Sequence, residues 1–166
     1  MRKVLIALAA VGALSACASR PDPTPTPSQP SQPTQPSQPA GPTPGSVEAF
    51  RVSVGDRVFF GYDRFDLSPE ARSVLARQAA WLRQYPNVRL LVAGNCDERG
   101  TREYNLALGA RRAAAARDYL VSLGVPASSV ETVSYGKERP LDARANEEAW
   151  SVNRNAHSQI VSGAVS

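Results

Sequence analysis

From residue 57 onward, short apolar runs alternate with longer stretches in which apolar residues recur at helical spacing. Residues 57–60, an arginine followed by three apolar residues, predict the first strand. Ser68 and Pro69 predict the start of a helix, because serine caps free N–H groups and proline suits the first turn. Apolar residues then recur every three or four positions until Pro86, which ends the helix.

The same alternation continues along the rest of the chain. Residues 88–93 and 130–135 predict two further strands, and residues 101–123 predict a long helix with a glycine and a proline after it. Residues 146–150 predict a short helix, and residues 158–161 a last strand that closes the sheet. The expected order is β-α-β-α-β-(α)-β. This is an α/β fold, an α+β sandwich with helices packed on one face of a small mixed sheet.

The first 16 residues have a different pattern. Two basic residues precede an apolar run over residues 4–14, which is shorter than the roughly 20 residues that span a bilayer. The string that follows, Leu14-Ser15-Ala16-Cys17, resembles the bacterial lipobox. We therefore expect residues 1–16 to be a lipoprotein signal peptide and Cys17 to carry lipid after cleavage. A plain secretory signal with a chance cysteine is the alternative.

Residues 20–45 are almost entirely Pro, Ser, Thr, Gln, Ala and Gly. Such a segment has no apolar residues to bury and favours the extended polyproline II conformation, at roughly 3.1 Å per residue. Residues 18–47 would therefore reach roughly 90 Å when stretched. We expect a lipid-bearing, disordered linker over residues 17–49 and one folded domain over residues 50–166. A partner site of the PxxP type within the linker is the alternative.

Charge does not indicate a nucleic-acid partner. The chain has 19 Lys and Arg against 15 Asp and Glu. Loss of the two basic residues of the signal leaves a net charge of +2, and no stripe of basic residues with interleaved aromatics is present. If Cys17 is acylated, Cys96 has no partner within the chain.

A polar loop, residues 94–101, follows the second predicted strand and leads into the long helix. Ligands of α/β sheets usually bind beyond the carboxyl ends of strands, and a helix N-terminus offers free N–H groups to an anion. Asn105, Leu108 and Arg112 share the helix face that can look toward this loop. Asp97 and Arg112 would then lie near one cleft, and their spacing alone favours a structural salt bridge.

The residues of this region resemble a known family. The motif Gly94-Asn95-x-Asp97-Glu98-Arg99-Gly100-Thr101-x-x-Tyr104-Asn105-x-x-Leu108-Gly109-x-Arg111-Arg112-Ala113 is similar to the signature of OmpA-like peptidoglycan-binding domains. Within that family the chain most resembles the peptidoglycan-associated lipoproteins. That closer resemblance rests on the lipobox, the proline-rich linker, and the stretches Phe59-Phe60-Gly61-Tyr62-Asp63 and Val133-Ser134-Tyr135-Gly136-Lys137-Glu138-x-Pro140. It covers about residues 57–161.

The resemblance implies noncovalent binding of diaminopimelate in the peptide stem of peptidoglycan, without a cofactor. Asp97 would take the ammonium group of diaminopimelate, and Arg112 would hold its carboxylate through a two-pronged hydrogen bond. Backbone N–H groups near Gly100 and Thr101 would assist with the carboxylate. The other side chains expected to line the cleft are Asn95, Tyr62, Asp66, Thr101, Asn105 and Leu108.

The resemblance also implies a place in the cell envelope. Lipid on Cys17 would anchor the chain to the outer membrane, with the domain facing the periplasm, and Ala18 after the cysteine agrees with that membrane. The domain would link the outer membrane to the cell wall within the Tol-Pal system, supporting envelope integrity and outer-membrane constriction at cell division. The family also docks onto TolB, through a surface that overlaps the peptidoglycan site. A domain that is mainly a docking module for TolB or another envelope protein is therefore the alternative.

Three positions depart from the family pattern. Asn95 stands where many members have histidine; it keeps a hydrogen-bonding side chain but loses titration near neutral pH. Cys96 replaces a small residue. The stretch Asn153-Arg154-Asn155-Ala156 stands where an Asn-Arg-Arg pattern is common, which leaves one cationic contact open.

An enzyme would need a nucleophile and a base. Cys96 and His157, the only histidine of the chain, are the candidate Cys–His pair, but the sequence indicates no carboxylate to orient the histidine. Asp97 and Glu98 are adjacent, so their side chains diverge and do not flank one glycosidic bond. One histidine and one cysteine without ligand spacing do not predict a metal site. We therefore expect a binding protein rather than an enzyme.

Overall fold

The computed structural model describes residues 41–165, so the predicted signal peptide, Cys17 and most of the proline-rich linker lie outside the described residues. Within them the elements follow the predicted order: β1 (Arg57–Phe59), α2 (Pro69–Gln84), β2 (Arg89–Asn95), α3 (Arg102–Ser122), β3 (Val130–Gly136), α4 (Glu147–Asn153) and β4 (Asn155–Ser162). Three short helical segments complete the list: α1 (Val47–Ala49), the π-helical η1 (Phe50–Val54) and the 3-10 turn η2 (Ala127–Ser129).

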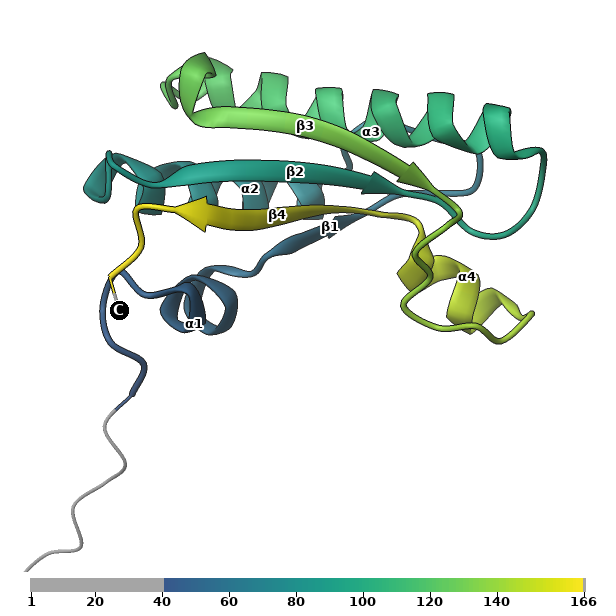
Figure 1. Cartoon of the computed structure of the whole chain (residues 1–166), viewed down its shortest axis with the longest axis horizontal. Coiled ribbons are helices and arrows are strands. Elements are labelled where there is room, and N and C mark those ends of the chain that lie inside the picture. The colour runs from purple at the N-terminus through teal and green to yellow at the C-terminus, as the bar shows by residue number, and fades with distance from the viewer. Residues whose placement is uncertain (1–40, 166) are drawn as a thin grey trace, which may run out of the picture. The chain divides into compact units, whose positions relative to one another are not determined.

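The four strands of the described residues form one mixed sheet in the order β1-β4-β2-β3. β2 and β3 are parallel, whereas β4 runs antiparallel to both of its neighbours. Figure 1 shows the last strand lying between β1 and β2, and α4 beyond the carboxyl end of β3. The predicted α/β order and the small mixed sheet are confirmed.

The hydrophobic core lies between the sheet and the two long helices. Leu75 of α2, Leu120 of α3 and Val92 of β2 are fully buried in it. Gln78 is a buried polar residue of α2, and its side chain is bonded to the carbonyl of Gly55 at 2.7 Å and to Ser158 of β4 at 2.8 Å. The prediction that the helices pack on one face of the sheet is confirmed for α2 and α3.

Polar caps set the starts of three helices. Ser68, Thr101 and Asn146 each accept a hydrogen bond from the backbone N–H three residues further on, at 3.2, 3.2 and 2.9 Å. The last strand begins earlier than its apolar pattern predicts. It starts at Asn155 because this residue and His157, although polar, pair with β1.

Residues ahead of β1 also pack against the domain. Phe50 is buried and meets Trp81 edge to face, with ring centroids 5.0 Å apart. The N–H of Val165 donates to the carbonyl of Gly45 at 3.0 Å. The predicted domain limits themselves stay a prediction. Within residues 41–165, every helix is too short or too polar to cross a membrane.

The sheet face turned away from α2 carries a cluster around His157. Its neighbour Ser158 contacts α2, so His157 points to the opposite face. The imidazole lies 3.1 Å from the carboxylate of Asp56 and 3.2 Å from the guanidinium of Arg57. Burial and the charge of Arg57 lower the pKa of His157 below its ordinary value, and Asp56 opposes them without cancelling the shift.

This shift predicts a pH-dependent stability. As the pH falls below about 6.5, the unfolded chain takes up a proton on His157 before the folded chain does, so the folded state loses stability. Between pH 7.5 and 5.5, wild type should lose more free energy of unfolding than His157→Gln, as measured by urea denaturation. Carboxylates titrate mostly below this window. Equal losses in the two proteins would contradict the prediction.

Candidate functional site

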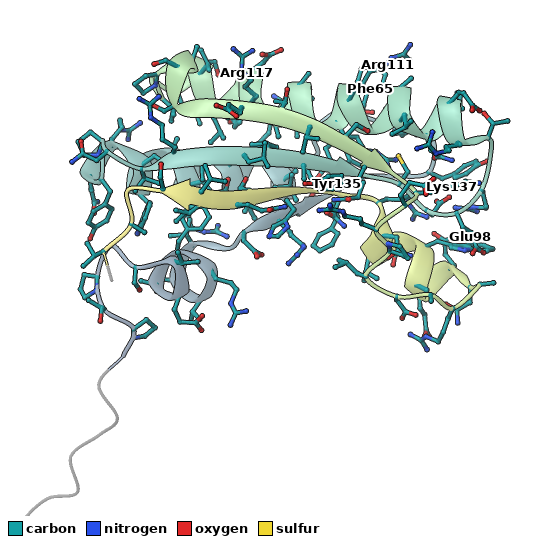
Figure 2. All side chains as sticks on the ribbon, viewed as in Figure 1. Phe65, Glu98, Arg111, Arg117, Tyr135 and Lys137 are labelled. Atoms are coloured by element: carbon teal, nitrogen blue, oxygen red, sulfur yellow. The ribbon has the colours of Figure 1, made fainter. Side chains whose placement is uncertain are left out.

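A cleft of about 250 Å³ opens beyond the carboxyl end of β2. Its walls come from the loop after β1, the loop after β2 and the first three turns of α3. The residues that line it are Tyr62, Asp63, Cys96, Asp97, Arg99, Gly100, Tyr104, Asn105, Leu108 and Arg112. In Figure 2, the labels of Glu98 and Lys137 mark the end of the domain at which this cleft lies. Five of the eight predicted site residues meet here: Tyr62, Asp97, Asn105, Leu108 and Arg112.

Asp97 is buried, with 4% of its surface exposed, and is held by two arginines. Its carboxylate accepts bonds from the side chain of Arg99 at 2.7 and 3.2 Å and from Arg154 at 3.3 Å. Burial alone would raise the pKa of Asp97, but the hydrogen bonds from Arg99 and Arg154 outweigh it and lower the pKa below the usual value. Asp97 is therefore an anion at neutral pH.

Arg154 follows α4 and is the cationic contact that the sequence left open. It is 6% exposed, and its guanidinium also donates to the carbonyl of Phe60 at 3.1 Å and to Glu147 at 2.7 Å. Together with its bond to Asp97, these bonds connect the end of α4 to the residue after β1 and to the loop after β2. Sequence reasoning missed this residue as part of the site, although its motif had drawn attention to a cationic position.

Arg112 is completely buried. Its guanidinium donates to three backbone carbonyls: those of Arg64 at 2.8 Å, Asn95 at 2.8 Å and Gly61 at 3.1 Å. Burial lowers the pKa of Arg112 from the ordinary arginine value. The spacing favoured a direct salt bridge between Asp97 and Arg112. That prediction is wrong, because the described residues contain no such bridge. Each side chain bonds to other groups instead, Asp97 to Arg99 and Arg154 and Arg112 to backbone oxygens.

The loop after β2 is fixed from both sides. The amide of Asn105 donates to the carbonyls of Arg99 at 2.8 Å and Thr101 at 3.1 Å. Lys137 donates to the carbonyls of Glu98 at 3.0 Å and Gly100 at 2.7 Å. Gly100 has a φ of +91°, a left-handed conformation that glycine adopts without strain. The cleft therefore has a wall that is set before any ligand binds.

Three predicted residues lie away from the cleft lining. Asn95 bonds to Asn155 at 2.9 Å, on the sheet face that also carries His157. Thr101 caps α3 with its hydroxyl. Asp66 is exposed and paired with Arg64 at 2.7 Å. As ligand contacts, all eight predicted residues stay predictions.

Asp63 lines the cleft, although it was named in the sequence only as part of a motif and was not predicted as a site residue. Its φ is +55°, and its carboxylate accepts a hydrogen bond from the hydroxyl of Tyr104. That bond raises the pKa of Tyr104 above its ordinary value. The motif that contains Asp63 does not show that its side chain lines the cleft, because its partner lies 41 residues further along the chain.

The Cys–His pair is not assembled in the described residues. Cys96 donates to the carbonyl of Asn105 at 3.4 Å, and burial raises the pKa of its thiol. His157 contacts Asp56 and Arg57 and lines a different hollow, together with Asn95. The structure does contain a carboxylate that can orient His157, that of Asp56. However, His157 and the thiol of Cys96 line different hollows.

Comparison with known proteins assigns the chain to a family. The sequence model of the OmpA family matches residues 59–154, more than half of the chain. The chain belongs to the OmpA family. A relative from Mesorhizobium japonicum is 50% identical over 153 residues, 92% of this chain and 88% of the relative. One from Rhizobium meliloti is 48% identical over 153 residues, 92% and 84% of the two chains. Both are named peptidoglycan-associated lipoprotein, so the predicted resemblance is confirmed.

A solved structure supports the same assignment. The crystal structure of the peptidoglycan-associated lipoprotein from Burkholderia pseudomallei has a TM-score of 0.62 and 40% sequence identity, over 63% of this chain and 89% of that one. All ten residues that line the cleft fall within the part matched by the OmpA family. The Asp56–His157 pair falls outside it.

Proposed function

We propose that this chain is an envelope lipoprotein whose domain binds peptidoglycan noncovalently, through diaminopimelate of the peptide stem. The observation that carries the proposal is the cleft beside Asp97, within an OmpA-family domain whose relatives are named peptidoglycan-associated lipoproteins. The side-chain end of free diaminopimelate carries an ammonium and a carboxylate on one carbon. Such a ligand requires an anion and hydrogen-bond donors at the two sides of one small cleft.

The cleft contains both kinds of group. Asp97 is the buried anion, and its low pKa keeps it charged at neutral pH. Arg112 lines the cleft and donates three hydrogen bonds to backbone carbonyls; we propose that its two remaining N–H groups bind the ligand carboxylate when the ligand enters the cleft. Tyr62 and Leu108 supply apolar surface for the methylene chain of the ligand. Binding of this kind involves no bond cleavage and no cofactor.

We propose further that lipid on Cys17 anchors the chain in the outer membrane, with the domain in the periplasm. The word lipoprotein in the relatives' names supports this, as does the lipobox-like string that ends in Cys17. The proline-rich linker would allow the domain to reach the cell wall, so the chain would connect the two layers. A role in the Tol-Pal system and in outer-membrane constriction at division follows from the same resemblance. The second candidate function is docking onto TolB through the same surface.

Sedimentation with diaminopimelate-type sacculi tests the proposal. Asp97→Asn should reduce the amount of protein that pellets about tenfold, because the ligand ammonium loses its charged partner. Asp142→Asn is a matched control, since Asp142 binds Arg144 two residues further on, as Asp97 binds Arg99, but does not line the cleft. Thermal melting should confirm that both variants fold.

Three results would contradict the proposal. The site assignment is wrong if Asp97→Asn pellets as well as wild type. Wild type that binds TolB but fails to pellet with sacculi would favour the docking alternative. Release of soluble muropeptides by wild type would show an enzyme instead of a binding protein.

A further inference from the structure

The side chain of Arg99, which lines the cleft, lies over two aromatic rings. The carbon at the centre of its guanidinium is 4.1 Å from the ring centroid of Tyr62 and 4.0 Å from that of Trp150. Both distances are within the range of cation–π attraction. Trp150 belongs to α4, and its indole N–H donates to Glu98 at 3.2 Å. Arg99 therefore contacts two aromatic rings, which come from two different parts of the chain.

The edge of the same guanidinium faces Asp97. Nε donates to Oδ1 at 3.2 Å, and Nη2 donates to Oδ2 at 2.7 Å. The backbone N–H of Arg99 also donates to Oδ1, at 3.2 Å, and Arg154 donates to Oδ2 at 3.3 Å. Each oxygen thus accepts two hydrogen bonds, and a carboxylate has about four acceptor sites. Asp97 has no acceptor site left for a ligand ammonium while Arg99 remains in place.

Of the arginines around Asp97, Arg99 is the one that can leave. Its side chain is 30% exposed, whereas that of Arg154 is 7% exposed and Arg112 is fully buried. A departing Arg99 side chain reaches water, so no buried cation is left without a partner. Its only other carboxylate among the described residues is that of Glu147, at 3.8 Å. The backbone of Arg99 stays fixed, because Asn105 holds its carbonyl.

We infer that Arg99 is an internal cation that occupies the ammonium position beside Asp97, and that a ligand ammonium binds by displacing it. We call Arg99 with its two aromatic rings, Tyr62 and Trp150, the Arg99 latch. The inference rests on the proposed function, since it assigns the ammonium end of the ligand to Asp97. Binding is then an exchange of one cation for another at a carboxylate that is never left unpaired. The affinity of the wild-type domain is lower than the cleft alone would give, because part of the binding energy breaks the Arg99–Asp97 pair.

Replacing Arg99 by glutamine tests the latch. The full chain is titrated calorimetrically with a synthetic stem peptide that carries a free diaminopimelate end. Arg99→Gln should bind this peptide about tenfold more tightly than wild type, because the loss of one charge-assisted pair no longer opposes binding. Arg99→Lys keeps the charge but lacks the fork that grips both oxygens, so it should lie between the two. A residue with only a structural role would give weaker binding on substitution.

Arg144→Gln is the matched control. Arg144 binds Asp142 as Arg99 binds Asp97, through a 2.7 Å hydrogen bond from Nη2 and a 2.9 Å hydrogen bond from the backbone N–H. Unlike Arg99, Arg144 does not line the cleft. It should bind the peptide as wild type does. A comparable gain in this control would assign the effect to net charge and overturn the latch.

The remaining outcomes separate the latch from the proposed function. If wild type binds and Arg99→Gln binds equally or more weakly, the latch is wrong and the proposed function stands. If Arg99→Gln binds and wild type shows no binding, the latch is supported, but the proposed binding by wild type is contradicted. If neither protein binds the peptide, the proposed function fails and the latch fails with it.

Discussion

Replacing Arg112 by alanine should lower the free energy of unfolding by about 3–5 kcal/mol. The side chain is fully buried and donates to the carbonyls of Gly61, Arg64 and Asn95. Alanine removes all three bonds at once and leaves a cavity beside three polar atoms that have lost their donor. Urea denaturation followed by circular dichroism measures the change, provided that the variant still unfolds in one cooperative step.

The neighbouring arginine provides the control. Figure 2 shows Arg111 on the solvent side of α3, and its closest aromatic contact is the ring of Phe65 at 5.7 Å. Arg111→Ala should cost less than about 1 kcal/mol, as exposed charged residues usually do. Equal losses of unfolding free energy in the two alanine variants would show that the bonds of Arg112 to the backbone stabilise the fold no more than an exposed arginine does.

This expectation changes how binding data on Arg112 are to be read. A variant that loses both the ligand and part of the fold does not show that Arg112 touches the ligand. Asp97→Asn is the better probe, because asparagine keeps the shape of the side chain and Arg154 keeps its bonds to Phe60 and Glu147. The site and the fold share residues here, so each binding experiment needs a stability measurement beside it.

The elements of the fold could be predicted because their signals are local. Ser68, Thr101 and Asn146 each cap the helix that follows them, and the cap lies within three residues of the N–H that it binds. The spacing of apolar residues then predicted the strands and the buried faces of α2 and α3. The start of β4 was missed, because Asn155 and His157 are polar and only their pairing with β1 makes them part of a strand.

The site was predicted in part, for the same reason. Motif and spacing placed Asp97 and Arg112 in one cleft, but they did not reveal the partners of either side chain. One of the carbonyls that bind Arg112 is that of Gly61, 51 positions away. Because every residue has a backbone carbonyl, the residue type does not show which one is an acceptor. Trp150 likewise lies far from Arg99 in sequence, so this contact of the latch follows only from the tertiary structure.

The contact between β2 and α3 at Gly94 predicts the second large effect. A Cβ built on Gly94 would lie 1.8 Å from the carbonyl oxygen of Gly109, and one built on Gly109 would lie 2.8 Å from the oxygen of Gly94. The obstacle is backbone, so no side-chain rotation relieves it. Gly94→Ala should force α3 away from β2 and destabilise the domain by about 3 kcal/mol, measured by urea denaturation.

The same substitution should also weaken the proposed ligand binding, because the displaced part of α3 carries Asn105 and Arg112. Gly61→Ala is the control: it lies near the same cleft and keeps the carbonyl that Arg112 binds. The atoms nearest to its Cβ would be those of the Arg64 side chain, from 3.3 Å, so a change below about 1 kcal/mol is expected. If Gly94→Ala unfolds at the same urea concentration as wild type, α3 does not depend on direct backbone contact with β2. The position of Arg112 would then be set by its three carbonyl partners alone.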